Sequence, residues 1–256
     1  MIHRQEQAQQ GIIGCLMTNE RVIPEARAHD AMRLIEKLEA EQTLQREEWV
    51  ALFAAQHDPA LRAHLFERAR AVRDEHYGRQ VFLRGLIEYS NYCKNDCYYC
   101  GIRASNAHLR RYRLSPEEIL ACCEQGYDLG YRTFVLQGGE DPKVSLVDIV
   151  GVLRIRFPDC AITVSAGELP REVYQQLFDA GADRYLLRHE TADPRHYGKL
   201  HPAFMSLEER KACLFTLREI GFQVGSGFLV GAPVQTTESM AANFAFLHEL
   251  DPHMIG

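Results

Sequence analysis

Cys93-Lys94-Asn95-Asp96-Cys97-Tyr98-Tyr99-Cys100 lies shortly after an apolar run, Val81–Glu88. The run predicts a β-strand, and the cysteines predict the loop that follows it. The spacing C-x3-C-x2-C can wrap three thiolates around a cubic iron–sulfur cluster. Such a cluster normally has four cysteine ligands. Because the local set stops at three, one iron would lack a protein ligand and would be open for chemistry.

Two other interpretations of the cysteines compete with a cluster. A structural zinc site usually has four ligands in C-x2-C pairs, and this sequence has no second pair. Chance clustering of buried thiols does not explain their polar neighbours on the same loop. The remaining cysteines past residue 100 lack ligand spacing and are interpreted as small buried side chains: Cys122, Cys123, Cys160 and Cys213.

Length and composition exclude several classes of protein. A chain of 256 residues with a formal net charge of −6 fits one globular domain with a sizeable core. A mildly acidic chain without a basic tract is a poor nucleic-acid binder. No apolar run reaches the ~18 residues of a membrane span, and the first residues lack a signal-peptide core. Clustered cysteines indicate ligands rather than disulfides, so we expect a cytoplasmic location.

A unit of helix, glycine and strand is repeated along the chain. Gly130, Gly181 and Gly221 each end an amphipathic helix, and an apolar run follows each glycine. Ser115 and Ser206 begin two predicted capping boxes. Repeated units of this kind predict parallel βα structure. Six strands are predicted, at Val81–Glu88, Thr133–Gln137, Ala161–Ala166, Arg184–Arg188, Gln223–Leu229 and His253–Gly256.

The predicted fold class is α/β, a TIM-type (β/α) barrel preceded by N-terminal helices. A closed barrel of this type has eight strands, and about six βα units are found, so the barrel is expected to be incomplete. We therefore expect a partial sequence, or a chain that a partner completes. The site of such a barrel lies at the carboxyl ends of the strands, where the loops after the first four predicted strands would converge.

The cysteine motif and its surroundings resemble the radical S-adenosylmethionine (SAM) superfamily, which implies a radical SAM barrel. Within it, the sequence is most similar to the HydE family of FeFe-hydrogenase maturases, and Arg188-His189-Glu190-Thr191 separates that family from biotin synthase and methylornithine synthase. The likeness covers roughly Met32 to Gly256. The segments that carry it are Glu88–Arg103, Asn106, Arg111–Arg113, Leu136–Pro142 and Gly181–Thr191.

The resemblance divides the chain into three segments. Residues 1–31 do not match the family and are expected to be an extension, with Met32 as an alternative start, or a poorly ordered tail. Residues 32–78 have helical periodicity and form an N-terminal helical segment. Residues 79–256 form the barrel, which is truncated at its C-terminus relative to the family.

The resemblance also implies ligands. Cys93, Cys97 and Cys100 would hold a 4Fe–4S cluster whose fourth iron binds SAM. Gly138-Gly139-Glu140 would contact the amino group of SAM, although an ordinary βα turn is the alternative. The other cofactor-binding positions are Tyr99, Ser165, Glu190 and Arg210. A carboxylate suits the sulfonium or ribose end of SAM and a guanidinium suits its carboxylate, but Arg210 could equally be a surface arginine.

Three further residues are candidates for substrate or anion binding inside the barrel: Arg84, Thr163 and Arg188. Charges at the ends of apolar strands are costly unless a ligand or a partner pairs them. Structural ion pairing, for instance with Glu88, is the competing interpretation. His189 is interpreted as a buried core histidine. Val234 stands where relatives commonly have glycine, so its loop is expected to differ.

The function implied by the resemblance is radical chemistry in maturation of the FeFe-hydrogenase diiron site. The cluster would cleave SAM to a 5′-deoxyadenosyl radical. Expected partners are a small-molecule or iron-complex substrate, other maturation proteins and an electron donor, with no nucleic acid and no membrane. The alternatives are another biotin-synthase-like radical SAM enzyme, such as methylornithine synthase, or a truncated cluster-binding protein without catalytic activity.

Overall fold

A computed structural model describes residues 25–256 of the chain. The prediction of an extension or a poorly ordered tail at residues 1–31 falls mostly on residues 1–24, which lie outside the described residues. The chain divides into two compact units, one ending at Arg79 and one spanning Gln80–Gly256. Each unit is described by itself.

The first unit is helical, as expected, and its described helices are α2 (Glu25–Glu41), α3 (Arg46–Ala54) and α4 (Pro59–Tyr77). Helix α2 contacts the other two, and it begins at Glu25, before the predicted start of the helical segment at Met32. The N-cap of α4 is Asp58, whose side chain accepts hydrogen bonds from the first turn. Gly78, with φ of +59°, ends α4. The packed face is apolar and includes Ile35, Trp49 and Leu61.

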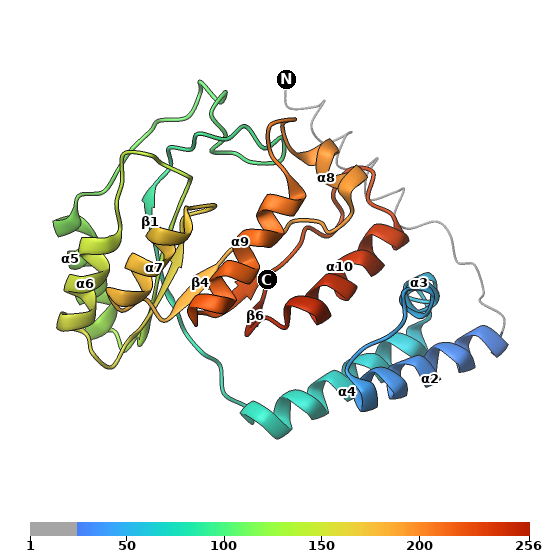
Figure 1. Cartoon of the computed structure of the whole chain (residues 1–256). Coiled ribbons are helices and arrows are strands. Elements are labelled where there is room, and N and C mark those ends of the chain that lie inside the picture. Colours follow the sequence, from blue (N-terminus) through green and yellow to red (C-terminus); the bar gives the residue numbers. More distant parts are fainter. Residues whose placement is uncertain (1–24) are drawn as a thin grey trace, which may run out of the picture. The chain divides into compact units, whose positions relative to one another are not determined.

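The second unit is built on a six-stranded parallel sheet in the order β1-β2-β3-β4-β5-β6 (Figure 1). The order follows the chain, as expected for consecutive right-handed βα units. The sheet is not closed by the described residues, and β1 and β6 are its edges. The strands are β1 (Gly85–Ser90), β2 (Thr133–Gly138), β3 (Ala161–Ser165), β4 (Arg184–Leu186), β5 (Gln223–Ser226) and β6 (Met254–Ile255).

All six predicted strands are present. The predicted bounds of β2, β3 and β6 differ from the observed ones by one residue at one or both ends, and those of β1, β4 and β5 were wrong by two residues or more. Strand β1 begins at Gly85, because its ladder with β2 begins there, and residues 81–83 are more than 60% exposed. Strands β4 and β5 end early, at Leu186 and Ser226. Apolar character extends beyond the ladders because residues after these strands are still buried in the loops of the site.

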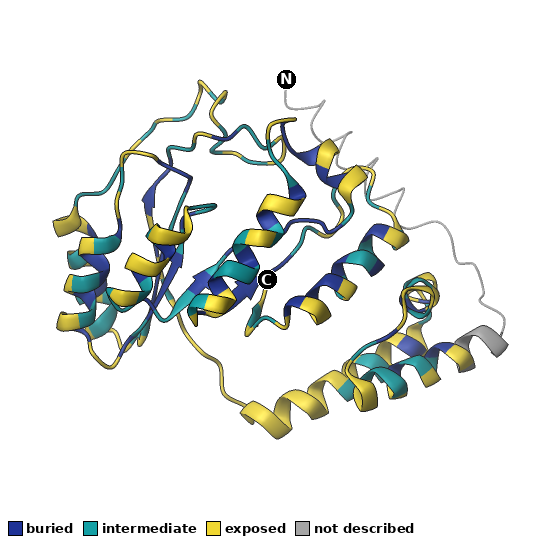
Figure 2. Ribbon diagram, in the orientation of Figure 1, coloured by how far each residue is buried: buried dark blue, intermediate teal, exposed yellow. Residues whose placement is uncertain are grey.

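The helices of this unit are α5 (Pro116–Asp128), α6 (Val147–Arg156), α7 (Arg171–Asp179), α8 (Pro194–Leu200), α9 (Leu207–Ile220) and α10 (Thr237–Leu250). Helices α5, α6, α7 and α9 contact one another in that order. The core lies between helices and sheet (Figure 2). Its sheet side includes one row of paired, buried residues: Ile87, Leu136, Val164, Tyr185 and Val224.

Helix ends follow the predicted capping chemistry, with one exception. Ser115 and Glu118 form both bonds of a capping box at α5. Ser206 accepts a bond from the Glu209 N–H at α9, but the structure records only that half of the predicted box. Gly221 ends α9 with a left-handed backbone, as does Gly181 just after α7.

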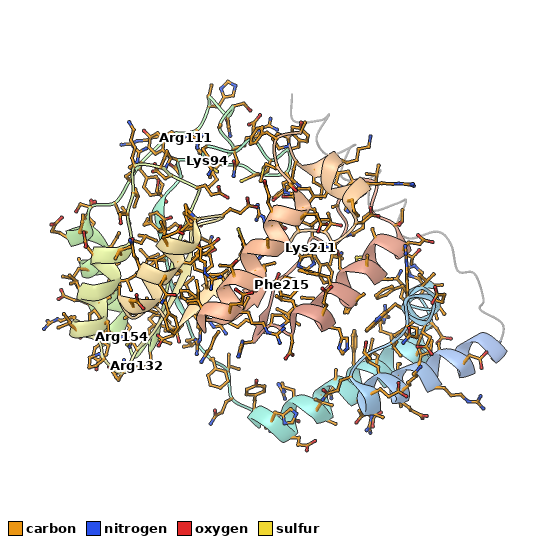
Figure 3. All side chains as sticks on the ribbon, viewed as in Figure 1. Lys94, Arg111, Arg132, Arg154, Lys211 and Phe215 are labelled. Carbon is orange, nitrogen blue, oxygen red and sulfur yellow. The ribbon has the colours of Figure 1, made fainter. Side chains whose placement is uncertain are left out.

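The two ends of the sheet have different tasks. At the amino ends of β3 and β4, Arg154 donates to the carbonyls of Cys160 and Gly181 and pairs with Asp183. Figure 3 shows Arg154 at the opposite end of the unit from Lys94 and Arg111, which lie in the loops after β1.

No helix within residues 25–256 is both long and apolar enough to cross a bilayer.

Candidate functional site

The cysteine loop connects β1 to α5. Cys93, Cys97 and Cys100 are half-buried and form no disulfides. The pKa of Cys97 is raised to about 11, chiefly by burial and also by the neighbouring thiols Cys93 and Cys100, against the opposing effects of Tyr99 and Arg210. Burial likewise raises the pKa of Cys93. Cys93 and Cys97, whose pKa values are raised, would become thiolates readily only beside a strong positive charge such as iron.

The three thiols of the described loop are not grouped around a single metal position. Within residues 25–256, no three Cys, His, Asp or Glu side chains converge tightly enough to hold a single metal ion. In a 4Fe–4S cluster each cysteine binds a different iron, so the sulfur atoms need not converge on one point. The donor set, three free thiols on one loop, therefore fits a cluster.

Arg111 holds the two flanks of the cysteine loop together. Its guanidinium donates to the carbonyl of Asn91, before the first cysteine, and to those of Ile102 and Arg103, after the last. The Asn91 side chain also accepts from the N–H of Tyr112 at 2.7 Å. The segment that follows the loop thus closes it from both sides.

The loop after β2 packs closely on the cysteine loop. A Cβ on Gly139 would lie 2.2 Å from the carbonyl oxygen of Tyr92 and 2.7 Å from Cβ of Cys93, and one on Gly138 would overlap the Tyr89 ring. The two glycines are therefore needed for packing between loops, in addition to any approach to a ligand. Asp141, which follows, accepts from Ser90 and from two nitrogens of Arg113.

The Glu140 carboxylate is engaged within the protein. One oxygen accepts the N–H of Glu168 at 2.9 Å, and the other lies 3.1 Å from Nζ of Lys94. The backbone carbonyl of Glu140 accepts a hydrogen bond from the backbone N–H of Lys94. Glu140 thus links the loops after β1, β2 and β3.

Tyr99 is fixed through a histidine that sequence reasoning did not select. Its hydroxyl lies 3.1 Å from Nε2 of His201, whose Nδ1 lies 3.1 Å from the Tyr197 carbonyl. A carbonyl only accepts, so Nδ1 carries the proton and Nε2 accepts from Tyr99. Burial lowers the pKa of His201 to about 4, which keeps the ring neutral near pH 7.

Glu190 lies after β4 with a left-handed backbone, φ +62°. Its N–H donates to the Gly227 carbonyl at 3.1 Å, and its carbonyl accepts from Leu229 at 2.9 Å. Its Oε2 is buried without a hydrogen-bond partner among the described residues. Burial raises its pKa, opposed by Arg188 and Arg210. A buried, unsatisfied carboxylate oxygen at strained backbone is typical of a ligand position.

Arg210 is not a surface residue: it lies in the first turn of α9 and is 7% exposed. Its Nε is ion-paired with Glu168, and Nη1 donates to the Arg188 carbonyl at 3.1 Å. Glu168 was missed by the sequence analysis. The expectation that site residues follow the carboxyl ends of the strands could have identified Glu168, because Glu168 follows the end of β3 by three residues.

The three interior candidates are placed differently. Thr163 is in the middle of β3, 2% exposed, and its hydroxyl has no hydrogen-bond partner among the described residues. Arg188 is exposed next to Glu190. Arg84 precedes β1, at the strand end away from the cysteine loop, and its Nη1 lies 3.5 Å from the Met254 sulfur. His189 is fully buried, and burial lowers its pKa to about 3.

The structure brings most of the predicted residues to one edge of the sheet. Cys97, Tyr99, Glu190 and Arg210 interact electrostatically, and Ser165 ends the adjacent strand β3. Arg84 is not brought to this group. An anionic and a cationic side chain beside three thiols could hold a zwitterionic ligand against a metal cluster.

Residues 87–247 match the radical SAM superfamily, and the chain belongs to this superfamily of enzymes. It is 43% identical over 202 residues to the [FeFe] hydrogenase maturase subunit HydE of Thermotoga maritima (strain ATCC 43589 / DSM 3109 / JCM 10099 / NBRC 100826 / MSB8). It is 30% identical over 196 residues to 3-methylornithine synthase of Methanosarcina barkeri (strain Fusaro / DSM 804). These alignments cover 78% and 75% of this chain, but only 58% and 55% of the relatives.

Solved structures confirm the fold class. Methylornithine synthase (PylB) aligns with a TM-score of 0.79 and 28% identity over 87% of this chain and 66% of its own. HydG, a maturase of the [FeFe]-hydrogenase, aligns with a TM-score of 0.78 and 26% identity over 89% of this chain and 54% of its own. The family implies a 4Fe–4S cluster and SAM as cofactors.

Proposed function

We propose that this chain carries the cluster-binding and SAM-binding part of a HydE-like radical SAM enzyme that acts in FeFe-hydrogenase maturation. The observation that supports this best is the three-thiol loop beside the Glu190 carboxylate, which has an unpartnered oxygen, and the buried Arg210 guanidinium. When bound, a reduced cluster and SAM supply a 5′-deoxyadenosyl radical.

In this proposal Cys93, Cys97 and Cys100 hold the cluster. Arg210 binds the SAM carboxylate and Glu190 binds the sulfonium or ribose end. The Tyr99 ring, oriented by His201, shields the cluster from water and packs beside adenine. Gly138, Gly139 and Glu140 position the cysteine loop and leave only backbone atoms toward the amino group of SAM. These roles follow from charge and placement.

Thr163 and Arg188 are proposed to contact a small anionic or iron-complex substrate over the inner face of the sheet. Thr163 has an unpartnered buried hydroxyl, and Arg188 lies beside Glu190. Arg84 lies at the opposite end of β1 and is not included in this substrate contact. Other maturation proteins and an electron donor are the expected partners.

Anaerobic reconstitution with iron and sulfide tests the cofactor assignment. We expect about four irons per chain, and 5′-deoxyadenosine formed from SAM only when a reductant is present. Cys97→Ser should lose both the bound iron and the formation of 5′-deoxyadenosine. Cys122→Ser, which changes an exposed cysteine on α5, should keep both. Stoichiometric zinc in place of iron would overturn the assignment.

The chain is 43% identical to a HydE subunit and 30% identical to 3-methylornithine synthase, which favours a role in hydrogenase maturation over the synthesis of methylornithine. The chain should restore hydrogenase activity to a maturation extract that lacks only its HydE. Formation of 3-methylornithine from lysine and SAM would favour the second candidate instead. Iron binding without any SAM cleavage would favour a cluster-binding protein without catalytic activity.

A further inference from the structure

We propose that Glu168 is a positioning residue that orients the Arg210 guanidinium for the carboxylate of SAM. This inference deepens the function proposed above and rests on it. Glu168 follows β3 in the loop that precedes α7. It is held at both its backbone and its side chain.

The backbone of Glu168 is fixed by its neighbours. Its N–H donates to Oε1 of Glu140 at 2.9 Å. Gly167 precedes it with φ of +76°, and a Cβ there would lie 2.1 Å from Cγ of Glu140. Only glycine allows the chain to turn this closely over the Glu140 side chain. This turn brings the Glu168 carboxylate into an ion pair with the Arg210 guanidinium.

The side chain of Glu168 then fixes Arg210. Glu168 is ion-paired with Nε, and the Arg188 carbonyl accepts from Nη1. Two contacts on different nitrogens restrict the orientation of the guanidinium, which in this proposal turns its remaining N–H groups toward a ligand carboxylate. The Arg210 side chain is 8% exposed and that of Glu168 is 21% exposed, so water does little to screen the pair.

The pair also connects separate parts of the site. Glu140 holds Lys94 of the cysteine loop with its second oxygen, at 3.1 Å. The chain of contacts therefore runs from Lys94 through Glu140 and Glu168 to Arg210. It joins the loops after β1, β2 and β3 to helix α9, and so relates the cluster loop to the residue proposed to bind the SAM carboxylate.

The opposite effect of Glu168 on SAM binding would follow from competition rather than positioning. Glu168 could compete with the SAM carboxylate for Arg210, and its removal would then tighten binding. The test titrates SAM calorimetrically into the anaerobically reconstituted full chain, with iron content measured in parallel. We expect Glu168→Gln to keep its iron and to bind SAM about 10- to 100-fold more weakly, the range for losing a partner that orients a ligand-binding group.

Glu172→Gln is the matched control, because it removes the same charge from an exposed residue in the first turn of α7. It should bind SAM like the unmodified chain. If Glu168→Gln does not fold, Glu168→Asp keeps the charge and should bind SAM more weakly with its iron retained. Equal or tighter binding by the Glu168 variant that folds would overturn the inference.

A double variant separates positioning from a general structural role. If Glu168 acts through Arg210, Glu168→Gln combined with Arg210→Lys should bind SAM no more weakly than Arg210→Lys alone. Additive losses would contradict the inference. An unmodified chain that binds iron but no SAM would overturn the proposed function together with this inference, whereas an unaffected Glu168→Gln variant would overturn only the inference.

Discussion

At the scale of single residues, four non-glycine residues of the described chain have a positive φ, which L-amino acids rarely adopt. Two of them bear on the site and on the sequence predictions: Glu190, with φ of +62°, and Val234, with φ of +57°. Such a conformation costs an L-residue about 1–2 kcal/mol. Glu190 is held by two backbone hydrogen bonds and belongs to the proposed site. Val234 is 69% exposed, so packing offsets little of its strain.

Val234→Gly is expected to raise the free energy of unfolding by about 1 kcal/mol, because glycine adopts this backbone without steric cost. Denaturant unfolding would measure it. Val230→Gly is the control, since Val230 is also exposed but does not have a positive φ. The strain argument fails if both variants lose stability equally.

His201 makes stability depend on pH. Its pKa is lowered to about 4 in the folded chain by burial, against about 6.5 when unfolded. The unfolded chain therefore binds a proton that the folded chain does not between pH 6.5 and 4, and stability falls as pH falls through that window. A shift of this size corresponds to about 3 kcal/mol at the acid end.

His201→Phe should flatten this part of the curve of unfolding free energy against pH, whatever it does to stability at pH 7. His57→Gln, at an exposed position in the first unit, should leave the slope unchanged. Unfolding followed by circular dichroism at several pH values measures the slopes. Parallel curves for the unmodified chain and His201→Phe would contradict the assignment.

At the scale of elements, the cysteine loop depends on segments outside it. Arg111 bridges carbonyls on both sides of the loop, and Asn106, further along, accepts a longer bond from the same guanidinium at 3.4 Å. Irregular loops have no repeating backbone pattern, so side chains must satisfy their carbonyls. The geometry of the thiols is thus set partly by Arg111.

Arg111→Gln is expected to lose about 10- to 100-fold in cluster retention, because the loop can then open and misplace the thiols. Iron release to a chelator under anaerobic conditions would measure the loss. Arg110→Gln changes the adjacent exposed arginine and should retain iron like the unmodified chain. Matching release rates for the two variants would refute a role for Arg111.

At the scale of the whole molecule, ligand binding should appear as stability. A ligand at 100 times its Kd adds about 2.7 kcal/mol if it binds only the folded chain, which for this length corresponds to about 5–10 °C in Tm. SAM should give this shift only in cluster-loaded protein. The Cys97→Ser variant should show none, and a similar shift in that variant would mean that SAM binds independently of the thiols.

The parallel α/β class and the order of its elements could be predicted from local patterns. Apolar runs after glycines and a capping box at Ser115 depend on residues near in sequence, and these signals identified all six strands. The bounds of β1 were wrong because an apolar run ends where composition changes, whereas a strand begins where a partner supplies hydrogen bonds. For β1 that partner starts at Phe134.

By itself, the sequence determined the three-thiol loop, the glycines after β2 and the approximate edge of the sheet where a site would form. Only the tertiary structure decided how the charges there are paired. Glu168 and His201 contact Arg210 and Tyr99 across 42 and 102 positions of the chain. Such contacts arise because parallel strands bring loops that are distant in sequence to one edge of the sheet. No local pattern of residues shows which side chains of those loops will meet.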